Sequence, residues 1–193
     1  MNISKRAQNM PQSPIRKLAK YAEAAKRNGV HIYSLNIGQP DIKTPQCALD
    51  AVAHFQQDIL EYSPSQGGIS LRAKMVQYYA EYGIDISPDE IIVTTGGSEA
   101  IMFAYMACLN PGDEIIVTDP SYANYMAFAI SCGAVVKSVK THIEDGFKLP
   151  PVEEFEKQIT DKTRAILICN PNNPTGYLYS KQEMRQIRDL VKK

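Results

Sequence analysis

The sequence predicts an α/β fold in which a mostly parallel sheet is covered by helices. From residue 90 onward, short runs rich in Ile and Val alternate with longer helical patterns, and Gly, Pro and Asn residues separate them. This alternation is typical of parallel strands joined by helical crossovers. The residues before Pro88 show mainly helical spacing and loops, so we expect a helical arm ahead of the alternating part.

Three helices are predicted in the N-terminal part. The first has apolar residues at helical spacing and a stop signal at Asn28-Gly29, the second has Pro in its first turn, and the third stops at Gly83. A short extended run follows the first helix. The expected helices are Ile15–Asn28, Pro45–Leu60 and Ser70–Tyr82, and the extended run is His31–Leu35.

Four strands and four helices are predicted in the C-terminal part. Each strand is a short β-branched run bounded by turn residues. The expected strands are Ile91–Thr95, Glu114–Thr118, Ala134–Val139 and Arg164–Cys169, and the helices that follow them are Ser98–Leu109, Tyr122–Cys132, Pro150–Gln158 and Lys181–Lys193.

The composition excludes several classes of protein. The 193 residues are 44% hydrophobic, which is enough for a real core, and 21 basic residues balance 21 acidic ones. A net charge of zero gives no reason to expect a nucleic acid or an anionic membrane as a partner. No run of 18 apolar residues and no N-terminal apolar segment is present, so we expect a cytoplasmic protein.

The cysteines and histidines do not predict a metal site. Four cysteines are widely spaced, no Cys-x-x-C pair occurs, and the three histidines have no partner at motif spacing. We expect reduced thiols in the core of a cytoplasmic protein and no bound metal.

Three polar motifs follow predicted strands, where open α/β sheets bind ligands. The sequence Asn-Pro-Asn-Asn-Pro-Thr-Gly at 170–176 forces an irregular turn and leaves amides at the sheet edge. Gly96-Gly97-Ser98-Glu99 opens a helix whose N–H groups suit a phosphate, although Ser98 is also an ordinary N-cap. Tyr122 can stack on a flat ring, and Tyr125 can line the same pocket. The alternative is that both tyrosines pack between helix and sheet, which we favour for Tyr125 more than for Tyr122.

The turn at 170–176 resembles the Asn-Pro-x-Asn-Pro-Thr-Gly signature of fold-type I aminotransferases, which depend on pyridoxal 5′-phosphate (PLP). Five motifs match that family in order. The resemblance implies the fold-type I PLP-transferase fold, with an N-terminal arm and part of the small domain at 1–45 and an incomplete large domain at 46–193. It also implies that Gly97, Ser98 and Glu99 hold the PLP phosphate, that Tyr122 covers its ring, and that Asn173 contacts its phenolic oxygen.

Two N-terminal motifs extend the resemblance. The segment with Gly38, Asn-Ile-Gly-Gln-Pro-Asp, is similar to the family stretch whose backbone lies against the substrate carboxylate. Gln39 stands where many relatives have Glu. The segment that begins at Tyr62 and includes Leu71-Arg72 resembles one whose tyrosine reaches the PLP phosphate of the neighbouring subunit, which implies a homodimer.

The family resemblance places the imine-forming lysine beyond Lys193, together with the acidic partner of the PLP pyridine and the arginine that binds the substrate carboxylate. No catalytic residue is therefore assigned in this chain, and Lys181 lies too early. We expect the N-terminal portion of an aminotransferase that moves an amino group between an L-amino acid and a 2-oxo acid, inactive by itself. Lyases and synthases of the same fold, and a non-catalytic fragment, remain alternatives.

A dinucleotide-dependent enzyme fits less well. Glu114 and Asp119 lie near the distance expected for the acidic residue of such a site, but the glycine pattern is not Gly-x-Gly-x-x-Gly. In the aminotransferase fold, the second strand should pair with the third and fourth, while the first stands apart. The 193 residues alone should then lack stability as a monomer, because strand edges would be uncovered.

Overall fold

The computed structural model describes residues 2–11, 13, 16–36 and 38–193. The chain forms two compact units, one made of residues 1–20 and Gly96–Lys193 and the other of Tyr21–Thr95. The domains expected from the sequence, 1–45 and 46–193, differ from these two units, and that division stays a prediction. Within the described ranges, no helix is both long and apolar enough to cross a bilayer.

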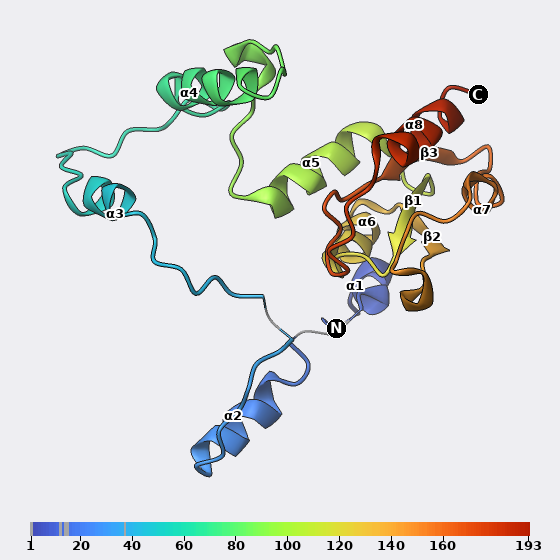
Figure 1. Ribbon diagram of the computed structural model, residues 1–193. Coiled ribbons are helices and arrows are strands. Elements are labelled where there is room, and N and C mark those ends of the chain that lie inside the picture. The colour runs from blue at the N-terminus through green and yellow to red at the C-terminus, as the bar shows by residue number, and fades with distance from the viewer. Residues whose placement is uncertain (1, 12, 14–15, 37) are drawn as a thin grey trace. The chain divides into compact units, whose positions relative to one another are not determined.

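The first unit is built on a three-stranded parallel sheet with the order β2-β1-β3 (Figure 1). Its strands are β1 (Glu114–Asp119), β2 (Val135–Lys140) and β3 (Thr163–Leu167). Glu114 lies opposite Val135 on one side and Thr163 on the other. The predicted pairing of the second expected strand with the third and fourth is confirmed.

The central strand β1 is buried along five of its six residues. Because side chains alternate across a strand, Ile115 and Ile116 enter different clusters on opposite faces. A strand covered on both faces favours apolar side chains at successive positions, which explains the Ile-Ile-Val run at its centre. The buried polar residues at its two ends are hydrogen-bonded: Glu114 to Thr160 and Thr118 to Tyr179.

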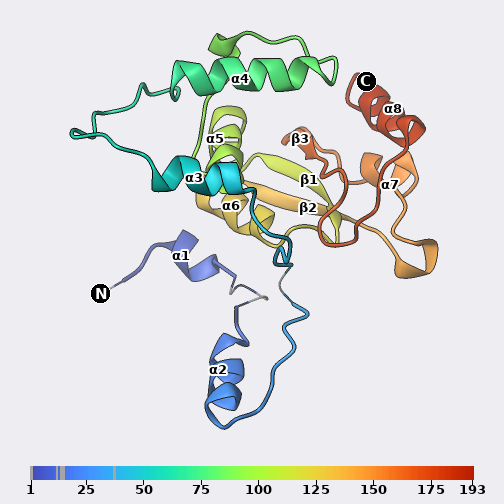
Figure 2. The ribbon, with the colours of Figure 1, turned by 60° about the vertical axis from the view of Figure 1, so that its left-hand side comes forward.

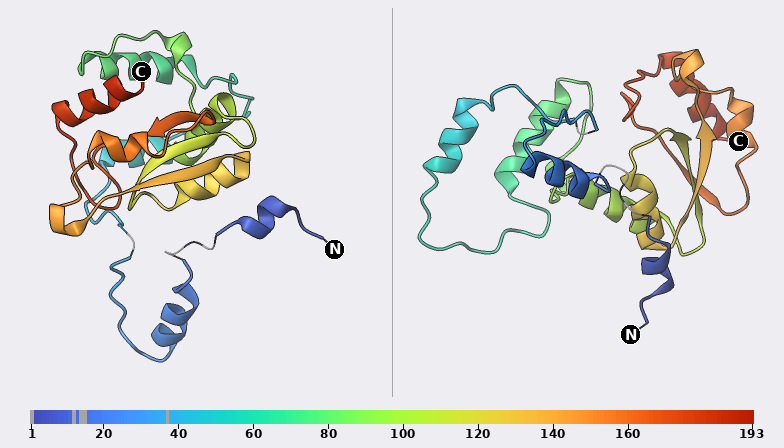
Figure 3. Two further views of the ribbon diagram at one scale, coloured as in Figure 1. Left: turned by 90° about the vertical axis from the view of Figure 1, so that its right-hand side faces the viewer. Right: turned by 90° about the horizontal axis from the view of Figure 1, so that it is seen from below.

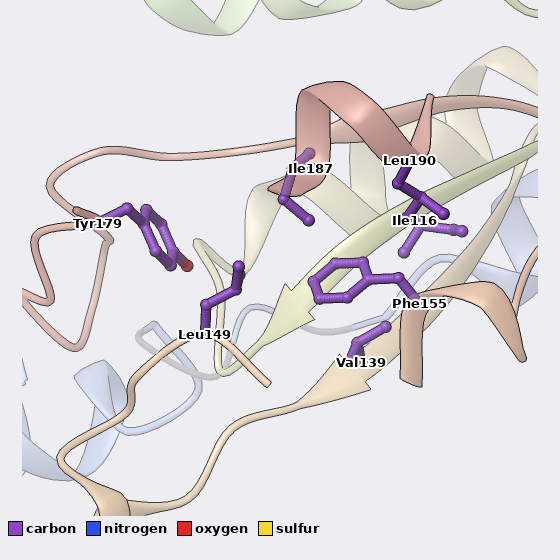
Figure 4. Close-up of a cluster of buried hydrophobic side chains, with 7 residues drawn as sticks. All are labelled: Ile116, Val139, Leu149, Phe155, Tyr179, Ile187 and Leu190. Atoms are coloured by element: carbon purple, nitrogen blue, oxygen red, sulfur yellow. The ribbon is translucent and has the colours of Figure 1, made fainter. Parts of the chain in front are cut away.

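One face of the sheet packs against α7 (Val152–Glu156) and α8 (Lys181–Leu190). Phe155 and Ile116 are fully buried at the centre of this cluster. Figure 4 shows how side chains from strands, helices and loops meet around Phe155: Ile116, Val139, Leu149, Tyr179, Ile187 and Leu190.

The other face packs against α5 (Gly97–Cys108) and α6 (Asn124–Cys132), as Figure 2 and Figure 3 show. Its cluster combines Tyr105, Leu109, Ile115, Ala129 and Ala134. The short helix α1 (Lys5–Asn9), which the sequence did not predict, lies against α6, and Arg6 donates to the carbonyl of Ser131 at 3.1 Å.

The second unit carries most of α2 (Ala19–Arg27) together with α3 (Gln46–Ala53), α4 (Ile69–Ala80) and the 3₁₀ helix η1 (Pro88–Glu90). A second short 3₁₀ helix, η2 (Ile143–Asp145), belongs to the first unit.

Two predicted elements in the second unit are wrong. Residues 91–95 form no strand, because they have no ladder partner among the described strands. Ile91 is nevertheless buried, and the Val93 N–H donates to the Gln66 carbonyl at 3.0 Å. The helix expected to reach Leu60 ends at Ala53. It buries no residue, so no packing extends it past His54.

The prediction of core thiols is also wrong in part. Cys47 and Cys108 are exposed, while Cys132 and Cys169 are half-buried, and all four are free. The apolar neighbours of Cys47 do not bury it, because none of the residues of α3 is buried.

Glu183 joins three segments on the α8 face. Its carboxylate accepts from the Ser180 N–H at 2.7 Å, from the Leu149 N–H at 3.1 Å and from the Tyr177 hydroxyl at 2.9 Å. Burial alone would raise the pKa of Glu183, but the hydrogen bonds from Ser180, Tyr177 and Leu149 outweigh it and hold the pKa below its ordinary value.

We predict that Glu183→Gln lowers the free energy of unfolding by about 1–3 kcal/mol at pH 7, because the N–H of buried Leu149 loses its carboxylate acceptor. Since the folded pKa lies below the reference value of 4.5, the carboxylate's contribution is present above that value and is lost as the pH falls through the folded pKa. Urea unfolding at pH 7 and pH 3 measures the difference, with the exposed Glu144→Gln as control. If the free energies of unfolding of wild type and Glu183→Gln differ by the same amount at pH 7 and pH 3, the carboxylate is not the cause of the difference.

Candidate functional site

The loop after β1 carries the aromatic residue singled out from the sequence. Tyr122 is half-buried, and its hydroxyl accepts a hydrogen bond from Asn124 Nδ2 at 2.7 Å. Its ring meets the ring of Tyr125 edge-on, with centroids 5.4 Å apart and planes at 85°. The side chain of Tyr122 is thus held from two directions.

Tyr125 provides one of the two contacts that hold the Tyr122 ring. It is buried, and burial raises the pKa of its phenol, with Cys169 as a neighbouring contributor. Its burial agrees with the interpretation that Tyr125 packs inside the fold, and its packing between helix and sheet stays a prediction. Burial likewise raises the pKa of Tyr105 to about 12, and the Tyr105 hydroxyl has no hydrogen-bond partner in the described part of the chain.

A hollow of about 520 Å³ lies beside Tyr122. It lies beside β1, β2 and the start of α6, and residues between α1 and α2 line one side of it. The side chains that line it include Tyr122, Asn124, Asp119, Ser138, Met10 and Pro11. Its walls mix apolar and polar groups, as small-molecule sites do.

The asparagine turn after β3 is closed by its own side chains. Asn170 Oδ1 accepts from the Tyr179 N–H at 3.0 Å, and Asn172 Nδ2 donates to Thr175 Oγ1 at 2.8 Å. Asn173 is exposed. Asn170 therefore helps to hold the turn, and Asn173 is the asparagine whose amide is accessible to a ligand.

Asn172 also joins the two loops. It is only 6% exposed, and its Nδ2 donates to the carbonyl of Pro120, in the loop after β1, at 3.2 Å. This contact brings Tyr122 and Asn173 onto neighbouring loops at one edge of the sheet. The sequence did not identify Asn172, because nothing in the motif distinguishes an inward asparagine from an outward one.

The α5 helix starts on the same side as these loops. A tight turn at 110–113 leads from α5 into β1, so the two run antiparallel. Ile101, one turn into α5, packs against the same cluster as Ile115, so the helix lies along this face of the sheet.

The start of α5 departs from one sequence interpretation. Gly96, with φ 80°, is the N-cap, and Gly97, Ser98 and Glu99 form the first turn, so Ser98 is not the cap. A Cβ at Gly96 or Gly97 would meet no atom within 4 Å, and Ser98 is exposed. The backbone of Gly96 and Gly97 therefore has room around it, and the Ser98 side chain is accessible to solvent.

Gly38 and Tyr62 belong to the second unit, where both are exposed. The segment after Tyr62 has a structural role that the sequence did not reveal. Arg72 is buried; its Nε donates to the Gly67 carbonyl at 3.1 Å and its Nη1 to the Pro88 carbonyl at 2.7 Å. Arg72 thereby ties the loop to η1.

The chain is similar to aminotransferases along its whole length. Residues 30–193 match the family described as aminotransferase class I and II. An aspartate aminotransferase from Thermotoga maritima is 36% identical over 193 residues, which are 99% of this chain and 51% of that protein. An aspartate/prephenate aminotransferase from Thermus thermophilus is 34% identical over 98% of this chain and 49% of its own length.

Solved structures agree with the sequence comparison. The aspartate aminotransferase structure from Thermotoga maritima superposes with a TM-score of 0.91 at 35% identity, over 98% of this chain and 51% of that one. An alanine aminotransferase from Pyrococcus furiosus gives 0.87 at 33%, over 99% and 49%. The predicted fold class is confirmed, and the chain spans about half the length of these relatives.

We predict that Gly67→Ala destabilises the second unit while Gly68→Ala does not. Gly67 has φ +93°, and a Cβ there would lie 2.6 Å from Val93 Cβ, whereas a Cβ at Gly68 would meet nothing within 4 Å. Amide exchange at Val93, whose N–H bonds to Gln66, should accelerate only in Gly67→Ala. Equal exchange in both variants would contradict the close approach.

Proposed function

The chain belongs to the class I and II aminotransferases, and from this membership we propose that it forms the N-terminal portion of a PLP-dependent aminotransferase. The enzyme would move an amino group between an L-amino acid and a 2-oxo acid. The observation that carries the proposal is the hydrogen bond from Asn172 to the Pro120 carbonyl, which sets the loop of Tyr122 beside the loop of Asn173.

The residues present fit PLP, a flat heteroaromatic ring with a phosphate. Tyr122 offers an aromatic face that is half-exposed at the end of β1. The hollow of about 520 Å³ beside it is lined by neither Asn173 nor residues 97–99, so it is not itself the PLP site. The glycine-led start of α5 offers helix N–H groups and the positive end of the helix dipole to an anion. When bound, PLP would act as the electron sink at the substrate's Cα.

Each site residue has a task in this proposal. Ser98, with the backbone of Gly97 and Glu99, would bind the phosphate, and Tyr122 would cover one face of the ring. The exposed amide of Asn173 would donate to the phenolic oxygen of PLP and so orient the ring in its plane. The backbone at Gly38 would lie against the substrate carboxylate.

We also propose that the enzyme is a cytoplasmic homodimer. Tyr62 is fully exposed, and the apolar Phe55 and Leu60 ahead of it are exposed by 63% and 81%. A second subunit would cover this apolar surface and receive the Tyr62 hydroxyl at its own phosphate site. The proton transfer at Cα needs the lysine that the family resemblance places beyond Lys193.

The names of the relatives favour transamination over the same-fold lyases. They are aspartate, aspartate/prephenate and alanine aminotransferases. Aspartate is therefore our first candidate for the amino donor. The alternative of a non-catalytic fragment is tested by adding PLP to the chain and recording its absorbance. A ~420 nm band that borohydride removes would require an imine-forming lysine, which we do not expect in these 193 residues.

We predict that Ser98→Ala and Asn173→Ala each weaken PLP binding by about 10–150-fold, because a hydrogen bond to a charged group is worth roughly 1.5–3 kcal/mol. Isothermal titration with PLP, supported by the ³¹P shift of its phosphate, measures the affinity of the 193-residue chain. Gln186→Ala, which removes an exposed amide on α8, is the control. Unchanged affinity in both site variants would remove the assignment.

We predict that Tyr122→Leu weakens PLP binding more than Tyr122→Phe does. Phenylalanine keeps the stacking face and loses only the hydrogen bond from Asn124, whereas leucine loses the ring itself. The same titration compares the three proteins. Equal losses in the two variants would show that the hydroxyl, and not the ring, is what PLP requires.

A further inference from the structure

We propose that Asn172 is a positioning residue that fixes the loop after β1 against the turn after β3 and so sets how Tyr122 and Asn173 face a common ligand. The family signature assigns the ligand contact to Asn173 and leaves position 172 open. The inference rests on the proposed function for the identity of the ligand, but the link between the loops stands on contacts within this chain.

The orientation of the Asn172 amide follows from its neighbours. The Pro120 carbonyl, 3.2 Å away, can only accept, so the Nδ2 group must face it. The second Nδ2 proton goes to Thr175 Oγ1 at 2.8 Å. Asn172 Oδ1 is buried and has no partner within the described residues. Both contacts that hold the loops therefore use the donors of this side chain.

The position of Asn172 in the chain makes the link direct. Pro120 stands two residues before Tyr122, and Thr175 stands two residues after Asn173. The backbone of Asn172 is fixed as well, since its N–H donates to the Tyr177 carbonyl at 2.8 Å and its carbonyl accepts from the Gly176 N–H at 2.7 Å. A displacement of either loop must move this one buried side chain.

Asn170 provides a matched comparison within the same turn. Its described side-chain contact uses the acceptor, Oδ1, which receives the Tyr179 N–H at 3.0 Å. An aspartate at 170 keeps that acceptor. An aspartate at 172 loses both donors and places a carboxylate oxygen against the Pro120 carbonyl in a buried position. The same chemical change should thus disrupt the contacts at 172 and preserve the described contact at 170.

The test compares Asn172→Asp and Asn170→Asp in the 193-residue chain by amide hydrogen exchange and by PLP titration. The reporters are the Tyr125 N–H at the start of α6, which donates to the Tyr122 carbonyl in the loop after β1 at 2.9 Å, and the Gly176 N–H in the turn after β3. In Asn172→Asp, exchange at both should rise together by about tenfold. Exchange at Ile116 and Val117 in β1 should not change. PLP affinity should fall at least about fivefold. Asn170→Asp should leave Tyr125 exchange and PLP affinity within about twofold of wild type.

Three results overturn the proposal: faster exchange confined to Gly176, equal effects of the two aspartates on Tyr125, or unchanged PLP affinity despite faster exchange in both loops. If Asn172→Asp does not fold, the neutral Asn172→Ala, which also lacks the donors, takes its place. If the wild-type chain alone does not bind PLP, the paired exchange of Tyr125 and Gly176 by itself decides whether Asn172 links the loops, and the proposed function is then tested by PLP titration with the imine-forming lysine present.

Discussion

The burial of β1 on both faces is the constraint on which the rest of the first unit depends. Ile115 faces the α5–α6 cluster and Ile116 faces the α7–α8 cluster, so a single strand anchors both layers of helices. Because the three strands are parallel, β1 and β3 end at one edge of the sheet. The loops that follow β1 and β3 therefore start beside each other, and their polar residues need only short-range contacts to form a site.

How much the sequence could predict depends on the kind of signal. The order β2-β1-β3, the placement of Tyr122 and Asn173 at strand ends and the burial of Tyr125 all follow from strong local patterns or from family resemblance. Ile91–Thr95 has the same strand-like pattern, yet it forms no ladder. A β-branched run is compatible with a strand, but a strand also needs a neighbouring strand to pair with, and the local sequence does not specify that partner.

The residues that the sequence missed act through contacts at long sequence separation. Arg72 reads as a surface residue of a loop motif, but it is buried and binds carbonyls at Gly67 and Pro88. Asn172 is similar, because its contact with Pro120 joins residues 52 positions apart. Arginine and asparagine are usually exposed, so burial of either one depends on acceptors that only the folded chain brings together.

The two prolines of the turn explain why it contains so many amides. Pro171 and Pro174 contribute no N–H groups, so the backbone of the turn offers fewer donors than an ordinary loop of its length. Side chains supply what is missing: Asn172 gives donors to Pro120 and Thr175, and Asn170 gives an acceptor to Tyr179. With these inward groups satisfying the turn, the amide of Asn173 is not needed for it. Because the neighbouring residues already fix the turn, little further conformational entropy is lost when the Asn173 amide binds a ligand. A precise ligand contact requires this kind of preorganisation.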